Sequence, residues 1–117
     1  MSAALENFLN ERLPLPGIVA CAVRQADRSI VSRRDGDALT TAQVEQMLSR
    51  LAAAAEGLKG HCFEGRSMCW TFDQARIHLS RRPDGAALAV FCENIPGQPP
   101  DPGALHLIQA FQELAEA

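Results

Sequence analysis

Hydrophobic and polar residues recur along this chain with a helical period in three segments, and the longest of these lies at residues 40–58. Its apolar positions are one, three or four residues apart and fall on one stripe of a helix: Val44, Met47, Leu48, Leu51, Ala55 and Leu58. Thr40 and Gln43 form a capping-box pair at the start, and Gly57 and Gly60 mark the end. The pattern predicts a long central helix with an opposite face made of Gln46, Arg50, Ala53 and Gly57.

Two shorter helices are predicted near the ends of the chain. The first covers residues 2–13, and Pro14 and Pro16 end it; its apolar face is Leu5, Phe8, Leu9 and Leu13. The last begins with Asp101 as N-cap and Pro102 at the first helical position. Its predicted core face is Leu105, Ile108, Phe111 and Ala115, flanked by Leu107 and Leu114.

Five segments have the character of β-strands. Residues 18–23 and 86–92 are unbroken apolar runs, which are typical of strands covered on both faces. Residues 29–32 and 61–72 mix polar with apolar residues, and residues 75–80 alternate strictly. Because interior strands need the apolar runs, the sequence predicts an α+β fold with a five-stranded antiparallel sheet of order 2-1-5-4-3. Helices cover both faces, and residues 1–117 form one domain.

Two strands carry more specific expectations. Over residues 61–72, Met68, Trp70 and Phe72 are expected to point the same way, with Gly65 as a bulge. Over residues 75–80, the period of two predicts a half-buried strand whose polar side, with His78, faces solvent.

The 61–72 strand is an edge with little protection against pairing. It is long and carries Met68, Trp70 and Phe72, with only Glu64, Arg66 and Gly65 as protection, whereas natural edge strands are usually short, charged or bulged. The simplest resolution is that it pairs with a copy of itself across a two-fold axis, where the neighbouring central helix would meet its twin. The alternative is that its aromatic side chains face only the core of their own protomer.

Composition and charge exclude several function classes. The 117 residues include 11 basic and 14 acidic side chains, a net charge of −3, which argues against nucleic acid as the main partner. No apolar run approaches the roughly 20 residues of a membrane span, and the N-terminus lacks the features of a secretion signal. The four cysteines contain no Cys-x-x-Cys pair, so free thiols in a reducing cytoplasm are expected.

Candidate catalytic chemistry is sparse. Cys62 and Cys69 are separated by an odd number of residues and point to opposite faces of a regular strand, which disfavours a metal site. Cys69 with His78 is the pair to inspect for a nucleophile and its base, although a buried cysteine acting as a small hydrophobe is the simpler interpretation. No phosphate-binding glycine loop is present, so nucleotide hydrolysis is not expected.

Arginines gather at two predicted turns: Arg24, Arg28, Arg33 and Arg34 near the first, Arg81 and Arg82 near the second. They fit either an acidic partner, including the phosphates of a GTPase, or simple solvated turns. The second interpretation is favoured because Asp27, Asp35 and Asp84 offset the charge.

The segment Leu-Pro-Leu-Pro-Gly-Ile-Val-Ala-Cys-Ala-Val at residues 13–23, followed by a short strand, a long helix, a three-strand meander and a final helix, resembles the roadblock/LC7 (dynein light chain-type) domain. The resemblance covers essentially the whole chain. Members commonly have an Asp-Gly-type turn in the first hairpin, whereas residues 25–29 here read Gln-Ala-Asp-Arg-Ser.

The resemblance implies a non-enzymatic module that forms homodimers or heterodimers and often binds Ras-like small GTPases, or serves as a scaffold in motor or signalling complexes. It assigns dimer contacts to residues 43–57 and 61–72. The expected interface residues are Gln46, Arg50, Ala53, Gly57, Arg66, Met68 and Trp70.

Two function hypotheses follow. The first is a cytoplasmic homodimeric adaptor without cofactor, metal or catalytic residues, which binds a small GTPase or a signalling complex. The second is a small-molecule sensor or enzyme on a similar layout, with a pocket between the sheet and residues 95–103, near His78 and Cys69.

Overall fold

The computed structural model describes residues 3–12, 17–25, 27–34, 39–59, 67–72, 75–82, 85–93 and 102–113. Along the chain the elements are α1 (Ala3–Arg12), β1 (Ile18–Arg24), β2 (Ile30–Arg34), α2 (Thr41–Lys59), β3 (Ser67–Thr71), β4 (Ala75–Arg81), β5 (Ala87–Glu93) and α3 (Pro102–Glu113). This is the order that the periodicity predicts.

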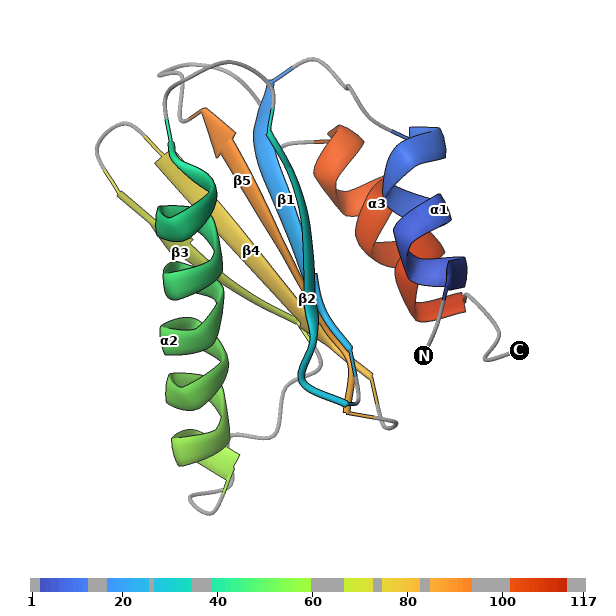
Figure 1. The fold of residues 1–117 in the computed structure, drawn as a ribbon. Helices are drawn as coiled ribbons and strands as arrows, with labels where there is room; N and C mark the ends of the chain where they lie inside the picture. Colours follow the sequence, from blue (N-terminus) through green and yellow to red (C-terminus); the bar gives the residue numbers. More distant parts are fainter. Residues whose placement is uncertain are drawn as a thin grey trace.

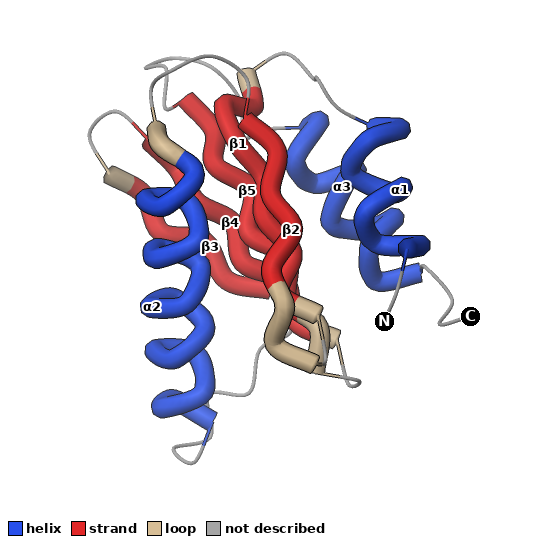
Figure 2. The backbone as a smooth tube through the Cα atoms, in the orientation of Figure 1, coloured by secondary structure: helices blue, strands red, loops and turns tan. Residues whose placement is uncertain are grey.

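The five strands form one antiparallel sheet in the order β2-β1-β5-β4-β3, as predicted. The two apolar runs become β1 and β5, which lie inside the sheet and are buried along almost their whole length. The mixed segments become β2 and β3 at the two margins (Figure 2). The order follows from burial, because a strand without polar positions is stable only where both its faces are covered.

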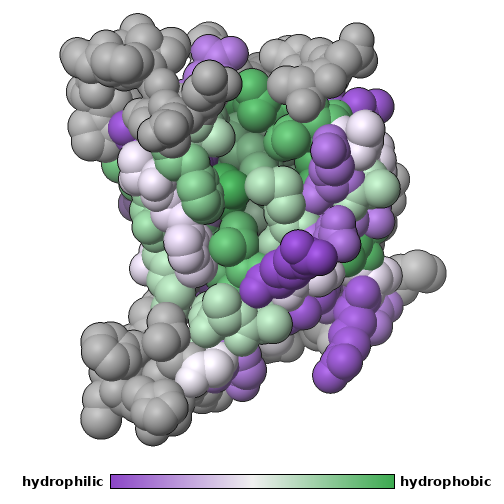
Figure 3. Space-filling model, turned by 90° about the vertical axis from the view of Figure 1, so that its left-hand side faces the viewer, coloured by the Kyte–Doolittle hydropathy of each residue, from purple (hydrophilic) through white to green (hydrophobic). Residues whose placement is uncertain are grey.

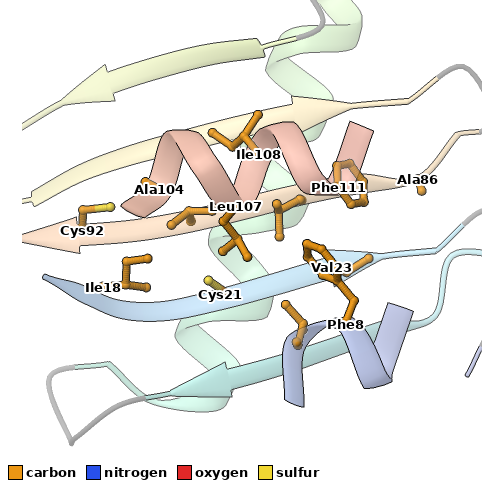
Figure 4. Close-up of a cluster of buried hydrophobic side chains, with 13 residues drawn as sticks. Phe8, Ile18, Cys21, Val23, Ala86, Cys92, Ala104, Leu107, Ile108 and Phe111 are labelled. Atoms are coloured by element: carbon orange, nitrogen blue, oxygen red, sulfur yellow. The ribbon is translucent and has the colours of Figure 1, made fainter. Parts of the chain in front are cut away.

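Helices cover the sheet unequally. Figure 1 shows α2 alone on one face and α1 with α3 on the other. Successive residues of β1 and β5 alternate between the two cores. Under α2 the middle strands present the alanines Ala20, Ala22, Ala87 and Ala89, together with the larger Phe91. Under α1 and α3 it presents larger ones, including Cys21, Val23, Leu88 and Val90, against Phe8 and Phe111, whose ring centroids lie 6.3 Å apart (Figure 4).

The start of α2 carries the predicted capping box. The Thr40 N–H donates to Gln43 Oε1 at 2.8 Å, and the Gln43 N–H donates to Thr40 Oγ1 at 3.0 Å. Of the predicted stripe, Val44, Leu48 and Ala55 are fully buried, whereas Met47 and Leu51 are half-buried. Ala52 is also buried. The core side of the helix is therefore rotated slightly from the predicted stripe.

The predicted core face of α3 is wrong in one position. Leu105 is 51% exposed, while Ala104, Leu107, Ile108 and Phe111 are buried. These four residues have the spacing i, i+3, i+4 and i+7, which fits one side of a helix. The prediction placed Leu107 on the flank because both leucines are apolar and the phase of the stripe depends on the sheet beneath it.

The prediction that β4 is half-buried, with His78 facing solvent, is also wrong. His78 is 6% exposed and Ser80 is fully buried. The reason is α3, which packs over β4 and β5. The side-chain amide of Gln112 on α3 donates from Nε2 to Ser80 Oγ at 2.5 Å and to the Arg81 carbonyl oxygen at 2.8 Å.

The first hairpin turns without the glycine that is typical of the roadblock/LC7 domain. The Arg28 N–H donates to the Gln25 carbonyl oxygen, and the Gln25 N–H donates to the Ser29 carbonyl oxygen, both at 2.8 Å. Arg28 takes a φ of 74°, in the left-handed region that glycine adopts easily. Arginine therefore takes a backbone conformation that glycine adopts more easily, and the hairpin still closes.

The third strand is described only from Ser67 onward, so the predicted first part of the 61–72 strand and the Gly65 bulge lie outside the described residues. Met68 and Trp70 lie on one side of β3, as predicted. Phe72 follows the end of the strand and is 51% exposed. No helix in the described part of the chain is long and apolar enough to cross a membrane.

Candidate interaction surface

Among the described residues, β3 is the last strand at one margin of the sheet. In the strand order, β3 stands at the end and pairs with β4 on one side, with five residues in register. Its side chains alternate: Ser67, Cys69 and Thr71 are exposed, while Met68 and Trp70 are half-buried. Because a strand has hydrogen-bonding groups on both edges, the edge of β3 that faces away from β4 is the one offered to a further strand.

The outer side of α2 presents the row of residues that the sequence singled out. Gln46, Arg50, Ala53 and Gly57 are all exposed, and their spacing of four, three and four residues places them along one line of the helix. A Cβ atom built at Gly57 would meet no atom within 4 Å, so the fold of the protomer does not itself require a glycine there. The row combines two polar side chains with two of the smallest residues.

Apolar side chains lie between this row and β3. Met47 and Leu51 of α2 and Met68 and Trp70 of β3 are half-buried against the alanine-rich core. In the view of this side of the molecule, apolar residues gather in the middle, with strongly hydrophilic ones beside them (Figure 3). We name this region the α2–β3 surface and define it as Gln46, Met47, Arg50, Leu51, Ala53, Gly57, Met68 and Trp70.

Six of these eight residues are among the interface residues that the sequence analysis expects, and their role in an interface stays a prediction. The sequence analysis missed Met47 and Leu51 as surface residues because it assigned them to the core stripe of the helix. The width of the apolar stripe could have indicated their exposure. Residues 47 and 51 lie at the side of the line formed by the buried Val44, Leu48 and Ala55. The seventh expected interface residue, Arg66, lies outside the described residues.

Cys69 and His78 are direct cross-strand partners in the register of β3 and β4, so their side chains share a face of the sheet. This face is the one on which α3 lies, and Cys69 is exposed while His78 is buried. A pocket formed by described residues lies on the other face, beside the C-terminal half of α2, and neither residue lines it. Residues 95–101, which would form one wall of the pocket in the small-molecule hypothesis, lie outside the described residues.

The other thiols of the described residues are structural. Cys21 and Cys92 are buried under α3 and α1. Burial raises the pKa of the Cys21 thiol far above its ordinary value, and the neighbouring Cys92 thiol adds to the shift. Thiolate is the reactive form, so Cys21 is inert in the folded protein. No group of three His, Cys, Asp or Glu side chains that could hold a metal ion occurs in the described ranges.

Comparisons with known proteins identify the fold. No protein-family model matches the sequence, and no curated protein sequence does. Solved structures do match: the gliding protein MglB from Thermus thermophilus superposes with a TM-score of 0.70 at 12% identity, over 97% of this chain and 93% of that one. A roadblock/LC7 domain from Streptomyces avermitilis matches with a TM-score of 0.52 at 17% identity, over 75% and 73% of the two chains.

The strand order, the placement of the helices and these superpositions define the class: the chain has the roadblock/LC7 fold. Within that class it is similar to MglB over nearly its whole length. A second MglB structure, in a tetrameric arrangement, gives a TM-score of 0.69 at 13% identity, over 97% of this chain and 88% of that one.

Proposed function

We propose that residues 1–117 form a single, non-enzymatic regulatory domain that homodimerises and binds a Ras-like small GTPase or a signalling complex in the cytoplasm. The observation that carries this proposal is the α2–β3 surface. It combines an open strand edge, half-buried apolar side chains and an exposed helix row on one side of the molecule.

The dimer would form by pairing β3 with its copy across a two-fold axis. Such pairing satisfies the backbone groups of the open edge and makes one continuous sheet across both protomers. The two α2 helices then lie side by side, with Arg50 at the contact and Ala53 and Gly57 small enough for close approach. Met68 and Trp70, which their own protomer covers only partly, become fully covered, and Arg66 belongs to the same contact.

Two observations support this use of the surface. MglB, to which this chain is similar in fold, occurs in a tetrameric arrangement in one solved structure. The resemblance to roadblock/LC7 domains implies dimers that often bind small GTPases. A partner that recognises the dimer would meet the α2 side, because α1 and α3 already occupy the other face of the sheet.

Self-association is tested by sedimentation velocity over a range of protein concentrations. The wild-type chain should sediment as a dimer, and Arg50→Glu should shift it toward monomer without lowering the melting temperature of the protomer, because Arg50 is exposed. Arg12→Glu on α1 is the matched control, since Arg12 is exposed on the opposite side of the sheet. A wild-type monomer at every concentration, or equal effects of the two variants, would refute the dimer.

A second variant separates contact from folding. Gly57→Ala fills no occupied space in the protomer and should raise helix stability by about 0.5–1 kcal/mol. If Gly57 lies where two α2 helices meet, the same change weakens the dimer. The stability of the protomer then rises while the affinity between protomers falls. A stabler protein with unchanged dimer affinity would place Gly57 outside the interface.

Partner binding is tested by pull-down from the source cell with GTP-loaded and GDP-loaded conditions compared. The expected result is retention of a small GTPase in one nucleotide state, reduced by Arg50→Glu and unaffected by Arg12→Glu. Equal retention by both variants would count against the α2–β3 surface as the partner site.

A further inference from the structure

Two arginine-bearing turns that are far apart in the sequence meet at one end of the sheet. The β1–β2 turn brings Arg24 and Arg28, and the end of β4 brings Arg81 and Arg82. Together with the C-terminal half of α2 they enclose a pocket of about 430 Å³. Its lining is completed by Gln25, Ala52, Ala53, Glu56 and Gly85.

The register of the sheet explains why two of these arginines face the same space. Arg24 of β1 and Arg81 of β4 are both opposite Ala87 of β5, one on each side. They therefore stand at the same level, two strand spacings or roughly 10 Å apart, on the face that α2 covers. Ala87 between them and Ala52 and Ala53 on the helix are small, and this leaves a hollow where larger residues would fill the core.

The pocket concentrates positive charge in an acidic protein. Among its described lining residues are four arginines and one glutamate, but the Arg82 guanidinium lies 5.2 Å from the centroid of the Phe111 ring, in the core on the other face of the sheet. Arg24, Arg28, Arg81 and Glu56 give the pocket a formal charge of +2, whereas the whole chain carries −3. Glu56 forms an ion pair with Arg81, and Arg24 and Arg28 form no ion pair with any residue in the described part of the chain. The nearest described acid in the turn, Asp27, is engaged by Ser29, whose N–H and hydroxyl both donate to its carboxylate at 2.9 and 2.6 Å.

Such a site selects a ligand by charge and geometry. Arginine presents a planar fork of donors that matches phosphate oxygens, and walls of low dielectric strengthen the field inside a cleft. Several converging guanidinium groups need an anion of more than one charge, which a single carboxylate does not supply. The volume lies within the range of small-molecule sites, roughly 300–1,000 Å³.

From the charge, the convergence of the two turns and the size of the hollow, we infer that this pocket binds adjacent phosphate groups of a small polyphosphorylated molecule. The site is distinct from the open strand edge used in the proposed dimer. Only Ala53 belongs both to its lining and to the α2–β3 surface.

Isothermal titration calorimetry at near-physiological salt tests the inference with pyrophosphate and tripolyphosphate as probes and acetate as the monovalent control. The expected result is saturable binding at one site per protomer, tighter for tripolyphosphate, and none for acetate. Arg24→Gln should weaken it about tenfold or more, because charge-assisted hydrogen bonds are lost. Absence of saturable polyphosphate binding to the folded wild-type protein overturns the inference.

A pair of charge-matched variants makes the test independent of folding. Glu56→Gln removes the one acid among the described lining residues and releases Arg81, so affinity should rise about three-fold or more. Glu45→Gln removes the same charge from the same helix, eleven residues away, and should leave affinity unchanged. Equal effects of the two changes mean that polyphosphate responds only to net charge, and the pocket is then not the site.

One further arm distinguishes the source of the phosphate groups. Phosphatidylcholine vesicles carrying a phosphatidylinositol bisphosphate are added in place of free tripolyphosphate. Binding of free tripolyphosphate that vesicles do not compete away supports a small molecule as ligand. Binding to vesicles alone, without affinity for free tripolyphosphate, overturns the inference that the ligand is a small molecule. Sedimentation of the same samples reports the dimer separately.

Discussion

At the scale of single residues, Arg28 is the one non-glycine residue with a positive φ in the described backbone. Its φ of 74° brings Cβ close to the following carbonyl, which costs an L-residue roughly 1–2 kcal/mol. The turn nevertheless keeps this shape because its backbone hydrogen bonds and the Asp27–Ser29 contact hold the chain on either side. An arginine in a glycine position also places one more cation at the mouth of the basic pocket.

Arg28→Gly should therefore stabilise the protein. We expect an increase of about 0.5–1 kcal/mol in the free energy of unfolding, smaller than the relieved strain because glycine gains entropy in the unfolded chain. Urea denaturation measures it. Arg28→Ala is the control, since it removes the same charge but keeps Cβ, and it should give no such gain; an equal gain would assign the effect to charge.

Ionisation of Asp27 makes the stability of this turn depend on pH. The hydrogen bond from the Ser29 hydroxyl, followed by the one from the Ser29 N–H, lowers the pKa of the Asp27 carboxyl below 3.8. The pKa of Asp27 is lower in the folded than in the unfolded protein. Its ionised carboxylate therefore contributes fully to the free energy of unfolding above pH about 4, and this contribution is lost as pH falls through the folded pKa. The carboxylate is fully exposed, so the contribution is small.

Asp27→Asn should consequently be less stable than wild type at pH 7, with a gap that closes as pH is lowered below 3.8. Unfolding in urea at a series of pH values measures the gap. A difference that persists unchanged at pH 2 would mean that the two proteins differ through something other than ionisation of Asp27.

At the scale of elements, α3 shows how the phase of an amphipathic helix is fixed. The helix has more apolar residues than one face holds, so the sequence permits two overlapping stripes that share Ile108 and Phe111. The stripe with Ala104 and Leu107 is the buried one. The small Ala104 and the long Leu107 fit against Cys21, Leu88 and Val90 of the sheet, as Figure 4 shows for the labelled members of this core.

A pair of leucine substitutions tests that phase. Leu107→Ala should destabilise the protein by about 2–5 kcal/mol, because it removes a fully buried side chain and leaves a cavity. Leu105→Ala should change the free energy of unfolding by no more than about 0.5 kcal/mol, since Leu105 is exposed. Thermal and urea melts of the two variants measure this. A larger loss of stability for Leu105→Ala than for Leu107→Ala would mean that the stripe containing Leu105 faces the sheet.

At the scale of the whole molecule, the two margins of the sheet differ in protection. The β2 margin is packed by both α1 and α2. The guanidinium of Arg33 on β2 also hydrogen-bonds Asn10 of α1. The β3 margin has exposed Ser67, Cys69 and Thr71 on the side where α3 covers β4 and β5. Within the described residues, β2 is therefore packed by a helix on each face, whereas β3 would gain its further contacts from a partner in the proposed dimer.

Hydrogen exchange should register this asymmetry. Amides of β1 and β5 should exchange most slowly, because they lie in the middle of the sheet. Amides of β3 should become slower as protein concentration rises, while those of β2 should not change. Mass spectrometry on samples diluted over a hundredfold range or more measures both edges in one experiment. Protection of β3 that is independent of concentration in a monomeric sample would show that its own chain already covers it.

The local pattern of residues was enough to predict the elements, their order along the chain and the order of strands in the sheet. These predictions depend on local properties: the period of the hydrophobic residues, the capping pair at the start of α2 and the unbroken apolar runs. Each involves residues only a few positions apart, such as Thr40 and Gln43. Strand order followed from the same pattern, because the strands without polar positions, β1 and β5, had to be interior. The fold class was therefore readable before any contact was known.

Contacts between side chains of different layers could not be predicted from the local pattern and became known from the folded chain. The burial of His78 and Ser80 depends on α3, whose Gln112 lies 32 positions from Ser80 along the chain. The basic pocket likewise exists because Arg24 and Arg81 both stand beside Ala87 in the register. A local pattern specifies which side of an element is apolar; which neighbour covers it, and which distant charges then meet, is set by how the layers pack.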